Sequence, residues 1–256
     1  MTAGSEGAPE LSVEGVSVAY DDLVAVWDAT LELRAGSITA LVGRNGAGKT
    51  TLLSGVCGLL PLRAGRVKLG SEDVTSVPPW RRASRGMAVV QEGKRVFREL
   101  TVRENLLLGL RGRGIKRAEF EPELTQLYER FPILGERRAQ PAAELSGGQQ
   151  QLLSIATALA SRPGVLLVDE PSSGLAPVFV DLVFECLVGL RDEGIAILLV
   201  EQLVEEVLGG VADEVVVLER GRVTLRDAAA NLSVDDVAKG IYSSVPAGSD
   251  AAPGNR

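Results

Sequence analysis

The sequence of 256 residues contains no histidine at all. This absence removes the commonest general base and the commonest nitrogen ligand for metal ions, so any chemistry must rely on carboxylates, lysine, hydroxyl groups and the backbone. Cysteine is nearly absent as well. Cys57 and Cys186 lie in apolar, helix-compatible segments, where we expect small core residues rather than a disulfide or a metal-binding pair.

Long apolar stretches are also missing. No run approaches the roughly 18–20 residues needed to cross a bilayer. The opening MTAGSEGAPE lacks the basic end and the apolar centre of a secretion signal. The net charge of −7 argues against a protein that coats nucleic acid, so we expect no nucleic-acid partner. Together these absences favour a cytoplasmic protein.

What the sequence does contain predicts an α/β fold. Hydrophobic residues make up 45% of the chain, which is ample for a core. The continuous apolar runs VLLV from Val165 and IAILLV from Ile195 are typical of strands buried on both faces of a parallel sheet. The segments LSVEGVSVAY and ATLELRAGS predict further strands, and DEVVVLE followed by GRVTLR predicts a closing hairpin.

One domain is expected over residues 10–242. The small, polar ends at residues 1–9 and 243–256 predict a disordered N-terminus and a flexible C-terminal tail. Within the domain, the segment TVRENLLLGL opens with Thr101 and has Glu104 three residues later, which is a capping-box pattern ahead of a leucine-rich helix. We expect a largely helical subdomain at about residues 95–160.

The most informative motif runs from Gly43 to Thr50 and reads GRNGAGKT. It follows the apolar run ITALV and precedes a helix-compatible segment, which is the context of a phosphate-binding loop. Its glycines let backbone N–H groups converge on phosphate oxygens, and the helix N-terminus adds partial positive charge. Lys49 can reach the outer phosphates, and the Thr50 hydroxyl can coordinate Mg²⁺. The competing interpretation is a glycine-rich turn without a ligand.

Two carboxylates follow the apolar run VLLV. Asp169 and Glu170 stand at the C-terminal end of that predicted strand, where ligands bind in open α/β sheets. Beside a phosphate loop, Asp169 is expected to be a second Mg²⁺ anchor, and Glu170 can polarise an attacking water. The alternative is a charged strand end that faces solvent.

The segment LSGGQ precedes a long apolar-faced helix. Ser146 can cap this helix, while Gly147 and Gly148 expose backbone N–H groups next to Gln149. These features predict a second phosphate-binding end in the same chain. Both ends could serve one nucleotide only if two chains face each other head to tail.

Tyr20 stands at the end of the strand predicted ahead of the phosphate loop. Its ring could stack on a nucleotide base, since every base offers a π-face. A half-buried strand tyrosine is the alternative, and the local sequence slightly favours it.

Together these residues resemble the ATPase subunit of an ABC (ATP-binding cassette) transporter. GRNGAGKT, LSGGQ and VLLVDE stand in that family's order and spacing, and the resemblance extends from about Leu11 to Asn231. It implies a P-loop fold of the ABC type, with a mainly parallel core sheet, an antiparallel β portion and a helical subdomain. It also implies ATP and Mg²⁺ as ligands. The residues that would bind ATP are Tyr20, Gly43, Arg44, Asn45, Gly46, Ala47, Gly48, Lys49, Thr50, Thr51, Ser146, Gly147, Gly148 and Gln149.

The resemblance also implies individual roles. It favours adenine stacking for Tyr20, and it makes Asp169 the Mg²⁺-associated carboxylate and Glu170 the catalytic base. The LSGGQ segment would close on ATP held by a partner subunit. In QEGKRVF, Gln91 is the candidate for sensing Mg²⁺, water and a permease, although its spacing from TVREN makes Glu92 nearly as good a match.

Two positions depart from the common family pattern. Gln202 stands where many members have histidine, and Ala176 stands where many have aspartate. Glutamine can hydrogen-bond a γ-phosphate but cannot carry a proton's charge, so turnover is expected to be slow or to depend on a partner site. Both departures resemble the ATPase subunits of branched-chain (hydrophobic) amino acid importers, whose close relatives handle urea and short amides.

This resemblance implies a set of partners. They are a second ATPase subunit, identical or different, transmembrane permease subunits and, through the complex, a solute-binding protein. The chain would lie on the inner face of the cell membrane. A basic set could contact a permease or anionic lipid, or could simply be solvated: Arg81, Arg82, Lys94, Arg95, Arg98 and Arg103.

Other functions remain as alternatives. An ATP-gated binding module with little hydrolysis is favoured by Gln202 and Ala176. A ribosome-acting relative would usually carry two cassettes in one chain, and a DNA-repair relative would need a long coiled-coil insertion. The length of this chain and its short helical segment disfavour both.

Overall fold

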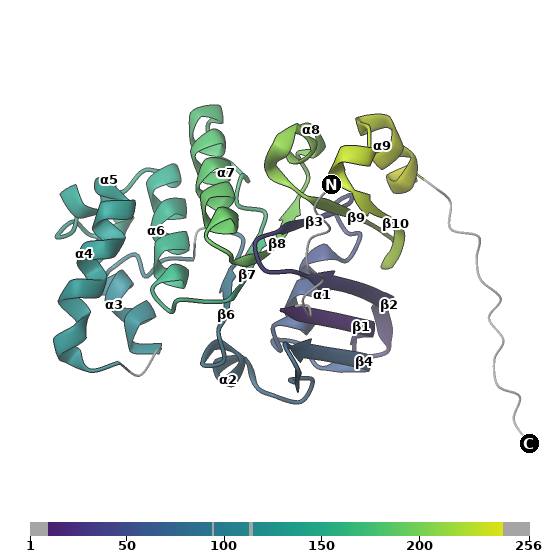
Figure 1. The fold of residues 1–256 in the computed structure, drawn as a ribbon, viewed down its shortest axis with the longest axis horizontal. Coiled ribbons are helices and arrows are strands. Elements are labelled where there is room, and N and C mark those ends of the chain that lie inside the picture. The colour runs from purple at the N-terminus through teal and green to yellow at the C-terminus, as the bar shows by residue number, and fades with distance from the viewer. Residues whose placement is uncertain (1–9, 94, 113–114, 243–256) are drawn as a thin grey trace, which may run out of the picture.

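The computed structural model describes residues 10–93, 95–112 and 115–242. The expectations for the two ends of the chain and for Lys94 therefore lie outside the described residues. Figure 1 shows an elongated molecule with mostly helices at one end and two β-sheets at the other.

The core is a six-stranded sheet with the order β10-β9-β3-β8-β7-β6. Its central strand β3 (Ile38–Val42) is buried throughout and runs parallel to β8 (Ala196–Glu201) and β9 (Glu214–Glu219). Strand β7 (Val165–Asp169) lies parallel between β8 and β6 (Met87–Val90). Strand β10 (Arg222–Ala228) closes one edge by antiparallel pairing with β9, which confirms the predicted hairpin.

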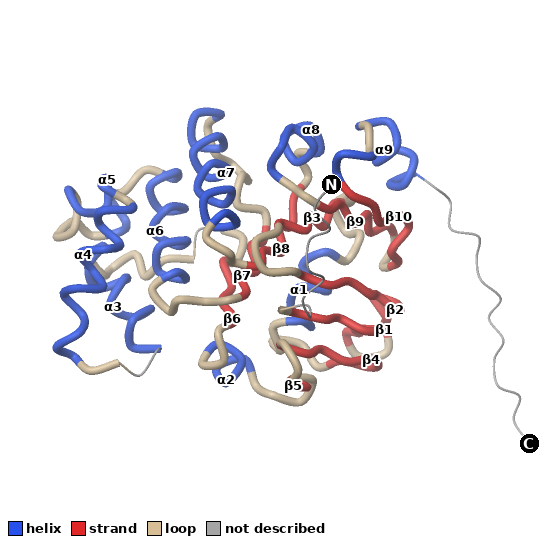
Figure 2. Tube along the Cα trace, viewed as in Figure 1, coloured by secondary structure: helices blue, strands red, loops and turns tan. Residues whose placement is uncertain are grey.

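A second, antiparallel sheet has the order β2-β1-β4-β5. It consists of β1 (Leu11–Tyr20), β2 (Leu23–Leu33), β4 (Leu62–Leu69) and the short β5 (Glu72–Asp73). Helix α1 (Lys49–Val56) lies between the two sheets (Figure 2), and its apolar residues share one core cluster with residues of both. The start of α1 therefore lies near the carboxyl end of the central strand β3.

The helical end contains α3 (Val102–Gly112), α4 (Phe120–Arg130), α5 (Pro132–Glu136) and α6 (Gly147–Leu159), with short 3₁₀ turns at Arg117–Glu119 and Ala142–Glu144. The predicted capping box forms at the start of α3. There the Thr101 amide donates to the Glu104 carboxylate over 2.8 Å, and the Glu104 amide donates to the Thr101 hydroxyl over 3.2 Å.

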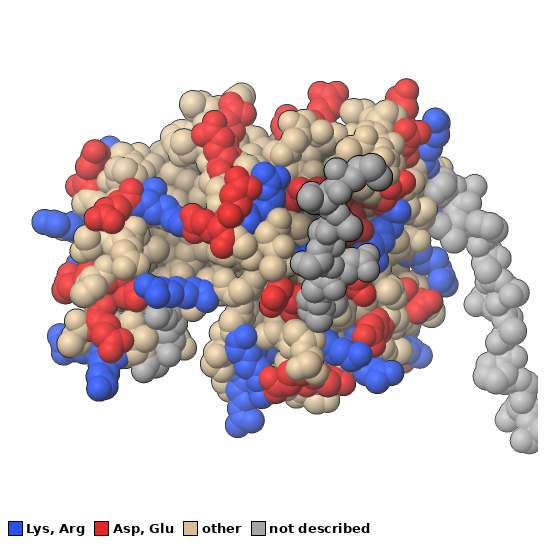
Figure 3. All heavy atoms as spheres, viewed as in Figure 1, with Lys and Arg blue, Asp and Glu red and all other residues tan. Residues whose placement is uncertain are grey.

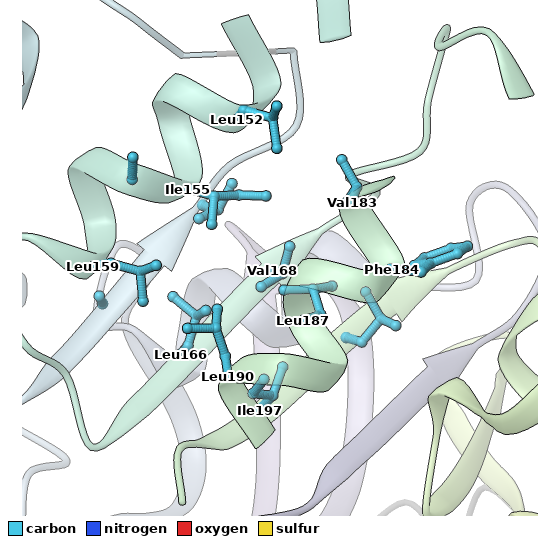
Figure 4. Close-up of a cluster of buried hydrophobic side chains, with 14 of the residues drawn as sticks. Leu152, Ile155, Leu159, Leu166, Val168, Val183, Phe184, Leu187, Leu190 and Ile197 are labelled. Atoms are coloured by element: carbon cyan, nitrogen blue, oxygen red, sulfur yellow. The ribbon is translucent and has the colours of Figure 1, made fainter. Parts of the chain in front are cut away.

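Helix α7 (Pro177–Asp192) joins the helical end to the core sheet. Figure 4 shows side chains of α6 and α7 packed over Leu166 and Val168 of β7. The alternate β7 residues Val165 and Leu167 belong to the cluster on the opposite face of the sheet. The strand is therefore buried on both sides, as its unbroken apolar run predicts.

The remaining helices cover the ends of strands. They are α2 (Pro79–Ala83), α8 (Val204–Glu206), the π-helical turn Val207–Val211, the 3₁₀ turn Ala229–Asn231 and α9 (Val234–Tyr242). No helix in the described part of the chain is long and apolar enough to cross a membrane. These observations confirm the predicted α/β class.

Arg82 corrects one sequence-based expectation. It was grouped with surface cations, but only 2% of its surface is exposed. Its guanidinium donates to the carbonyl oxygens of Val77 and Thr75 (2.8 Å each) and also to that of Val56 at the end of α1. It is therefore a structural link between α2 and α1, because it supplies donors to helix-end carbonyls that lack partners within the helix.

Candidate active site

The phosphate-loop motif occupies the turn from β3 into α1. Gly46 and Gly48 have φ values of +79° and +105°, a region that other residues rarely adopt. A Cβ at Gly43 would lie 2.2 Å from the carbonyl oxygen of Leu218 in β9. The loop thus follows a buried strand, opens a helix and needs glycine for two separate reasons.

Lys49 is held inside the loop that precedes it. Only 4% of it is exposed, and its ammonium donates to the carbonyl oxygens of Gly43 (2.9 Å) and Arg44 (3.4 Å). It also lies 3.3 Å from the Glu170 carboxylate. The positive charge is therefore fixed where the loop amides and the start of α1 favour an anion.

Asp169 ends β7 next to the start of α1. The Thr50 hydroxyl donates to its carboxylate over 3.3 Å. Burial raises the pKa of Asp169 to about 6; the Thr50 hydrogen bond opposes this shift, while the charges of Glu170 and Glu92 add to it. A buried carboxylate beside a hydroxyl and further acids suits a hard divalent cation, which would stabilise the ionised form. The donor set therefore fits Mg²⁺.

Glu170 follows Asp169 in a left-handed backbone conformation, with φ of +42°. Its amide donates to the Val200 carbonyl oxygen over 2.9 Å, which anchors the turn to β8. Its carboxylate accepts a hydrogen bond of 2.6 Å from the Gln202 amide group and pairs with Lys49. Of the four residues predicted to be catalytic (Lys49, Gln91, Glu170 and Gln202), Glu170 and Gln202 thus meet from loops that follow the neighbouring strands β7 and β8.

A hollow of about 470 Å³ brings these groups together. Its lining combines the phosphate loop, the start of α1 and the loops after β6, β7 and β8. The lining residues are Ala25, Asn45, Gly46, Gly48, Lys49, Thr50, Thr51, Glu92, Glu170, Ser173 and Gln202.

Some predicted residues lie beside this hollow rather than in its lining: Tyr20, Gly43, Arg44, Ala47 and Asp169. Ala47 is buried within the loop. Arg44 lies against α9, with its guanidinium carbon 5.4 Å from the centre of the Tyr242 ring. Tyr20, half exposed at the end of β1, places its hydroxyl 3.4 Å from that of Thr51. The half-exposed ring of Tyr20 is therefore accessible at the rim of the hollow.

The two candidates for the sensing position, Gln91 and Glu92, line different hollows. Glu92 lines the hollow, whereas Gln91 lines a different groove together with residues of α2, α3 and α6. Successive residues of an extended segment face opposite sides, and this segment directly follows β6. The geometry therefore favours Glu92 over Gln91 as the residue that faces the hollow, and Gln91 as a Mg²⁺-sensing group stays a prediction.

The LSGGQ segment lies elsewhere. Ser146 caps α6: its hydroxyl accepts from the Gln149 amide over 3.3 Å, and the Gln149 side chain accepts from the Ser146 amide over 3.0 Å. A Cβ at Gly148 would lie 2.2 Å from the Phe179 ring, so α6 packs tightly on α7 here. None of Ser146, Gly147, Gly148 and Gln149 lines the hollow, so this chain does not complete it.

Three further residues at the site, Ala25, Ser173 and Glu201, were not among the predicted ones. The first two line the hollow, while Glu201 lies beneath it at the end of β8, with 1% of its surface exposed. Glu201 is an acidic residue that ends a buried strand, which is the signal that identified Asp169. Ala25 and Ser173 carry no comparable signal in the sequence.

The fold and this site define a P-loop nucleoside triphosphatase. A family model described as ABC transporter matches residues 26–173. The chain belongs to this family, and it is an ATP-binding subunit of the ABC ATPase type.

Curated relatives match nearly the whole chain. It is 40% identical to the high-affinity branched-chain amino acid transport ATP-binding protein BraG of Pseudomonas aeruginosa, over 91% of this chain and 98% of that protein. A probable branched-chain amino acid transport ATP-binding protein, LivF of Archaeoglobus fulgidus, is 36% identical over 85% and 91%. The lipopolysaccharide export system ATP-binding protein LptB of Escherichia coli is 32% identical over 91% and 96%.

Solved structures agree with this assignment. The ATP-binding subunit of an ABC transporter superposes with a TM-score of 0.79 at 27% identity, covering 90% of this chain and 98% of that one. An ATP-binding cassette solved in its ADP conformation gives 0.78 at 25% identity, covering 91% and 94%. The predicted family and fold are confirmed.

Proposed function

We propose that this chain hydrolyses MgATP to power import of branched-chain amino acids through partner permeases. The observation that carries the proposal is the meeting of Lys49, the Thr50–Asp169 pair and the Glu170–Gln202 pair around one hollow. The substrate class rests on the 40% and 36% identity to importer subunits. The 32% identity to an exporter subunit leaves the choice of solute to the membrane partners.

Each group has a distinct task in the proposed reaction. The loop amides and Lys49 would bind the β- and γ-phosphates, and Thr50 and Asp169 would hold Mg²⁺, which when bound would supply positive charge beside the phosphates. Glu170 orients the attacking water and accepts its proton. Gln202 positions the Glu170 carboxylate over 2.6 Å and offers an amide to the γ-phosphate, but it cannot itself take the proton.

Completion of the site requires a second subunit. The hollow lacks the LSGGQ residues, which lie on the N-terminal turn of α6 in this chain. Two subunits arranged head to tail would place this turn of each chain over the nucleotide of the other. Exposed Ser146 and partly exposed Gly147 could then offer hydroxyl and N–H donors to phosphate oxygens.

A permease segment is proposed to dock in the groove that contains Gln91. This groove has a volume of about 480 Å³ and opens between α2, β6, α3 and α6; Figure 3 shows the outline notched between the helical end and the sheet end. Trp80 on α2, 71% exposed, offers the kind of aromatic anchor that is enriched at interfaces. Such docking would place the chain peripherally on the inner face of the membrane.

Reconstitution with its permeases tests this function. The chain should co-purify with them, hydrolyse ATP faster in the complex than alone, and drive ATP-dependent uptake of labelled leucine into vesicles. A Trp80→Ala variant should lose co-purification but keep ATP binding. Uptake that continues without ATP, or turnover that stays negligible in the complete complex, would contradict the proposal and favour an ATP-gated binding module.

A further inference from the structure

The buried carboxylate of Glu201 joins the two loops that carry the proposed catalytic pair. One carboxylate oxygen accepts from the backbone N–H of Ser172 over 3.1 Å, and the other accepts from the backbone N–H of Gln202 over 2.9 Å. Ser172 lies two residues after Glu170, and Gln202 directly follows Glu201. A single side chain thereby connects the loop after β7 to the loop after β8.

Glu201 lies at a buried strand end beside the phosphate loop. It is 1% exposed at the end of β8, and in the sheet register it pairs with Val42, the last residue before the phosphate loop. Two backbone N–H donors satisfy its two carboxylate oxygens, as the burial of polar groups requires. Three loops of the site thus converge on one strand end, and Glu201 fixes two of them.

The distance of 2.6 Å between the side-chain nitrogen of Gln202 (Nε2) and the Glu170 carboxylate depends on the relative position of these two loops. A shift of either loop by about 1 Å would break this contact or misplace Glu170 against the γ-phosphate, and such misplacement can lower rates about 100-fold. In the described part of the chain, neither the phosphate loop nor Lys49 donates a hydrogen bond to Glu201, so nucleotide binding does not depend on it in the same way.

We propose that Glu201 is a positioning residue for hydrolysis. Through the backbone N–H groups of Ser172 and Gln202, it holds Glu170 and Gln202 in place relative to each other. This inference rests on the proposed roles of Glu170 and Gln202. It predicts a variant that binds ATP normally but turns it over slowly.

Glu201→Gln tests the proposal in the full chain with MgATP. The amide keeps the shape of the side chain but has only one acceptor oxygen, so one of the two N–H groups must face an NH₂ group. We expect kcat to fall at least tenfold, with KM for ATP and Tm close to the wild-type values. Glu201→Asp, which retains two acceptor oxygens, should keep more turnover than Glu201→Gln.

Two further measurements separate positioning from a structural role. In a Gln202→Ala background, Glu201→Gln should lower kcat by a smaller factor than in the wild type, because the contact between Gln202 and Glu170 that it helps to position is already gone. Amide hydrogen exchange of the nucleotide-free chain should accelerate in the loops at residues 170–175 and 201–205 and stay unchanged in the phosphate loop. The exchange measurement remains informative however slow the basal turnover is.

Glu219→Gln is the matched control. Glu219 is also a buried glutamate at the end of a core-sheet strand, 8% exposed, but it pairs with Arg220. Its variant should retain both turnover and exchange rates. The proposal is overturned if Glu201→Gln leaves kcat unchanged, if its effect multiplies fully with Gln202→Ala, or if Tm and ATP binding fall together with kcat. Undiminished turnover of Glu170→Gln would instead refute the assigned base.

Discussion

At the scale of single residues, the site depends on charges held out of water. Lys49 and Asp169 are 4% and 2% exposed, and Glu170 contacts both Lys49 and Gln202. Buried charges are tolerated only when they are paired or when a ligand compensates them. Their arrangement around one hollow therefore indicates a site that binds a charged ligand.

Lys49→Ala should weaken ATP binding about 10- to 100-fold, because a charge-assisted contact to phosphate contributes about 1.5–3 kcal/mol. Titration calorimetry with MgATP measures the change. Lys68→Ala is the control, since Lys68 makes a surface ion pair with Glu14, and it should bind like the wild type. Equal ATP affinity of both variants would contradict a role for Lys49 in binding phosphate.

Glu170→Gln should retain ATP binding while turnover falls about 100-fold or more, because general-base catalysis contributes about 10²–10⁴ to the rate. ATP that is bound and not cleaved should hold two subunits together. Size-exclusion chromatography with MgATP should show a stable dimer of this variant. Exposed Glu205 offers the control Glu205→Gln, which should behave like the wild type. Wild-type turnover in Glu170→Gln would exclude the base assignment.

Asp169→Asn should stabilise the nucleotide-free protein in a pH-dependent manner. Burial raises the Asp169 pKa from 3.8 to about 6. The folded state thus prefers the protonated acid, and its contribution to stability is full below pH 3.8 and is lost as the pH rises through 6. The variant's advantage should grow over this interval to about 3 kcal/mol, at 1.36 kcal/mol per pKa unit.

Urea unfolding of both proteins between pH 4.5 and 8 measures this advantage. MgATP should reduce the difference above pH 6, because the bound cation stabilises the ionised Asp169 of the wild type. A stability difference that is constant across this range would show that burial does not perturb Asp169.

At the scale of elements, the position of α1 depends on α2. The Arg82 guanidinium on α2 supplies donors to the carbonyl oxygens of Gly55 and Val56, near the end of α1. Because α1 also begins with Lys49, the proposed phosphate-binding lysine, an anchor at its far end stabilises the layer that carries the site. Arg81, the neighbour of Arg82 on the same helix, is exposed to solvent.

Arg82→Ala should lower the free energy of unfolding by about 3 kcal/mol, since several buried carbonyl oxygens lose a donor. Arg81→Ala, on the same helix, should change it by less than about 0.5 kcal/mol. Chemical denaturation measures both values. Similar small effects of the two substitutions would contradict the structural role of Arg82.

At the scale of the whole molecule, the two ends predicted to bind phosphate lie apart. The loop before α1 lines the hollow, and the LSGGQ turn caps α6 at the helical end, as the separation of these helices in Figure 1 illustrates. The proposed head-to-tail arrangement uses a second subunit to bring such a turn to the hollow without a change of fold.

Cysteine cross-linking tests this arrangement. Asn45→Cys and Ser146→Cys are combined in Glu170→Gln, after replacement of the native cysteines Cys57 and Cys186 by serine. Addition of MgATP and an oxidant should give a covalent dimer on a non-reducing gel. Either new cysteine alone should give much less product. A monomeric product in the doubly substituted chain would refute the head-to-tail arrangement.

The sequence predicted the strand–loop–helix around Lys49, the carboxylates after β7 and the cap at Ser146. Each depends on neighbours in the chain: glycines next to a buried strand, an acid at a strand end, or a serine three residues before a glutamine. The choice between Gln91 and Glu92 did not follow from the sequence, because a spacing argument cannot say which side of the extended segment faces the hollow.

What the sequence alone determined is therefore the chemistry available: a phosphate loop, acids at strand ends and a capped helix, without histidine. Tertiary structure decided which of these groups meet. It placed Glu170 against Gln202 and Lys49, buried Arg82 under α1 and brought Glu201 beneath two loops. Local motifs arise from short-range backbone geometry, whereas contacts between loops depend on the order and register of strands that are far apart in the chain.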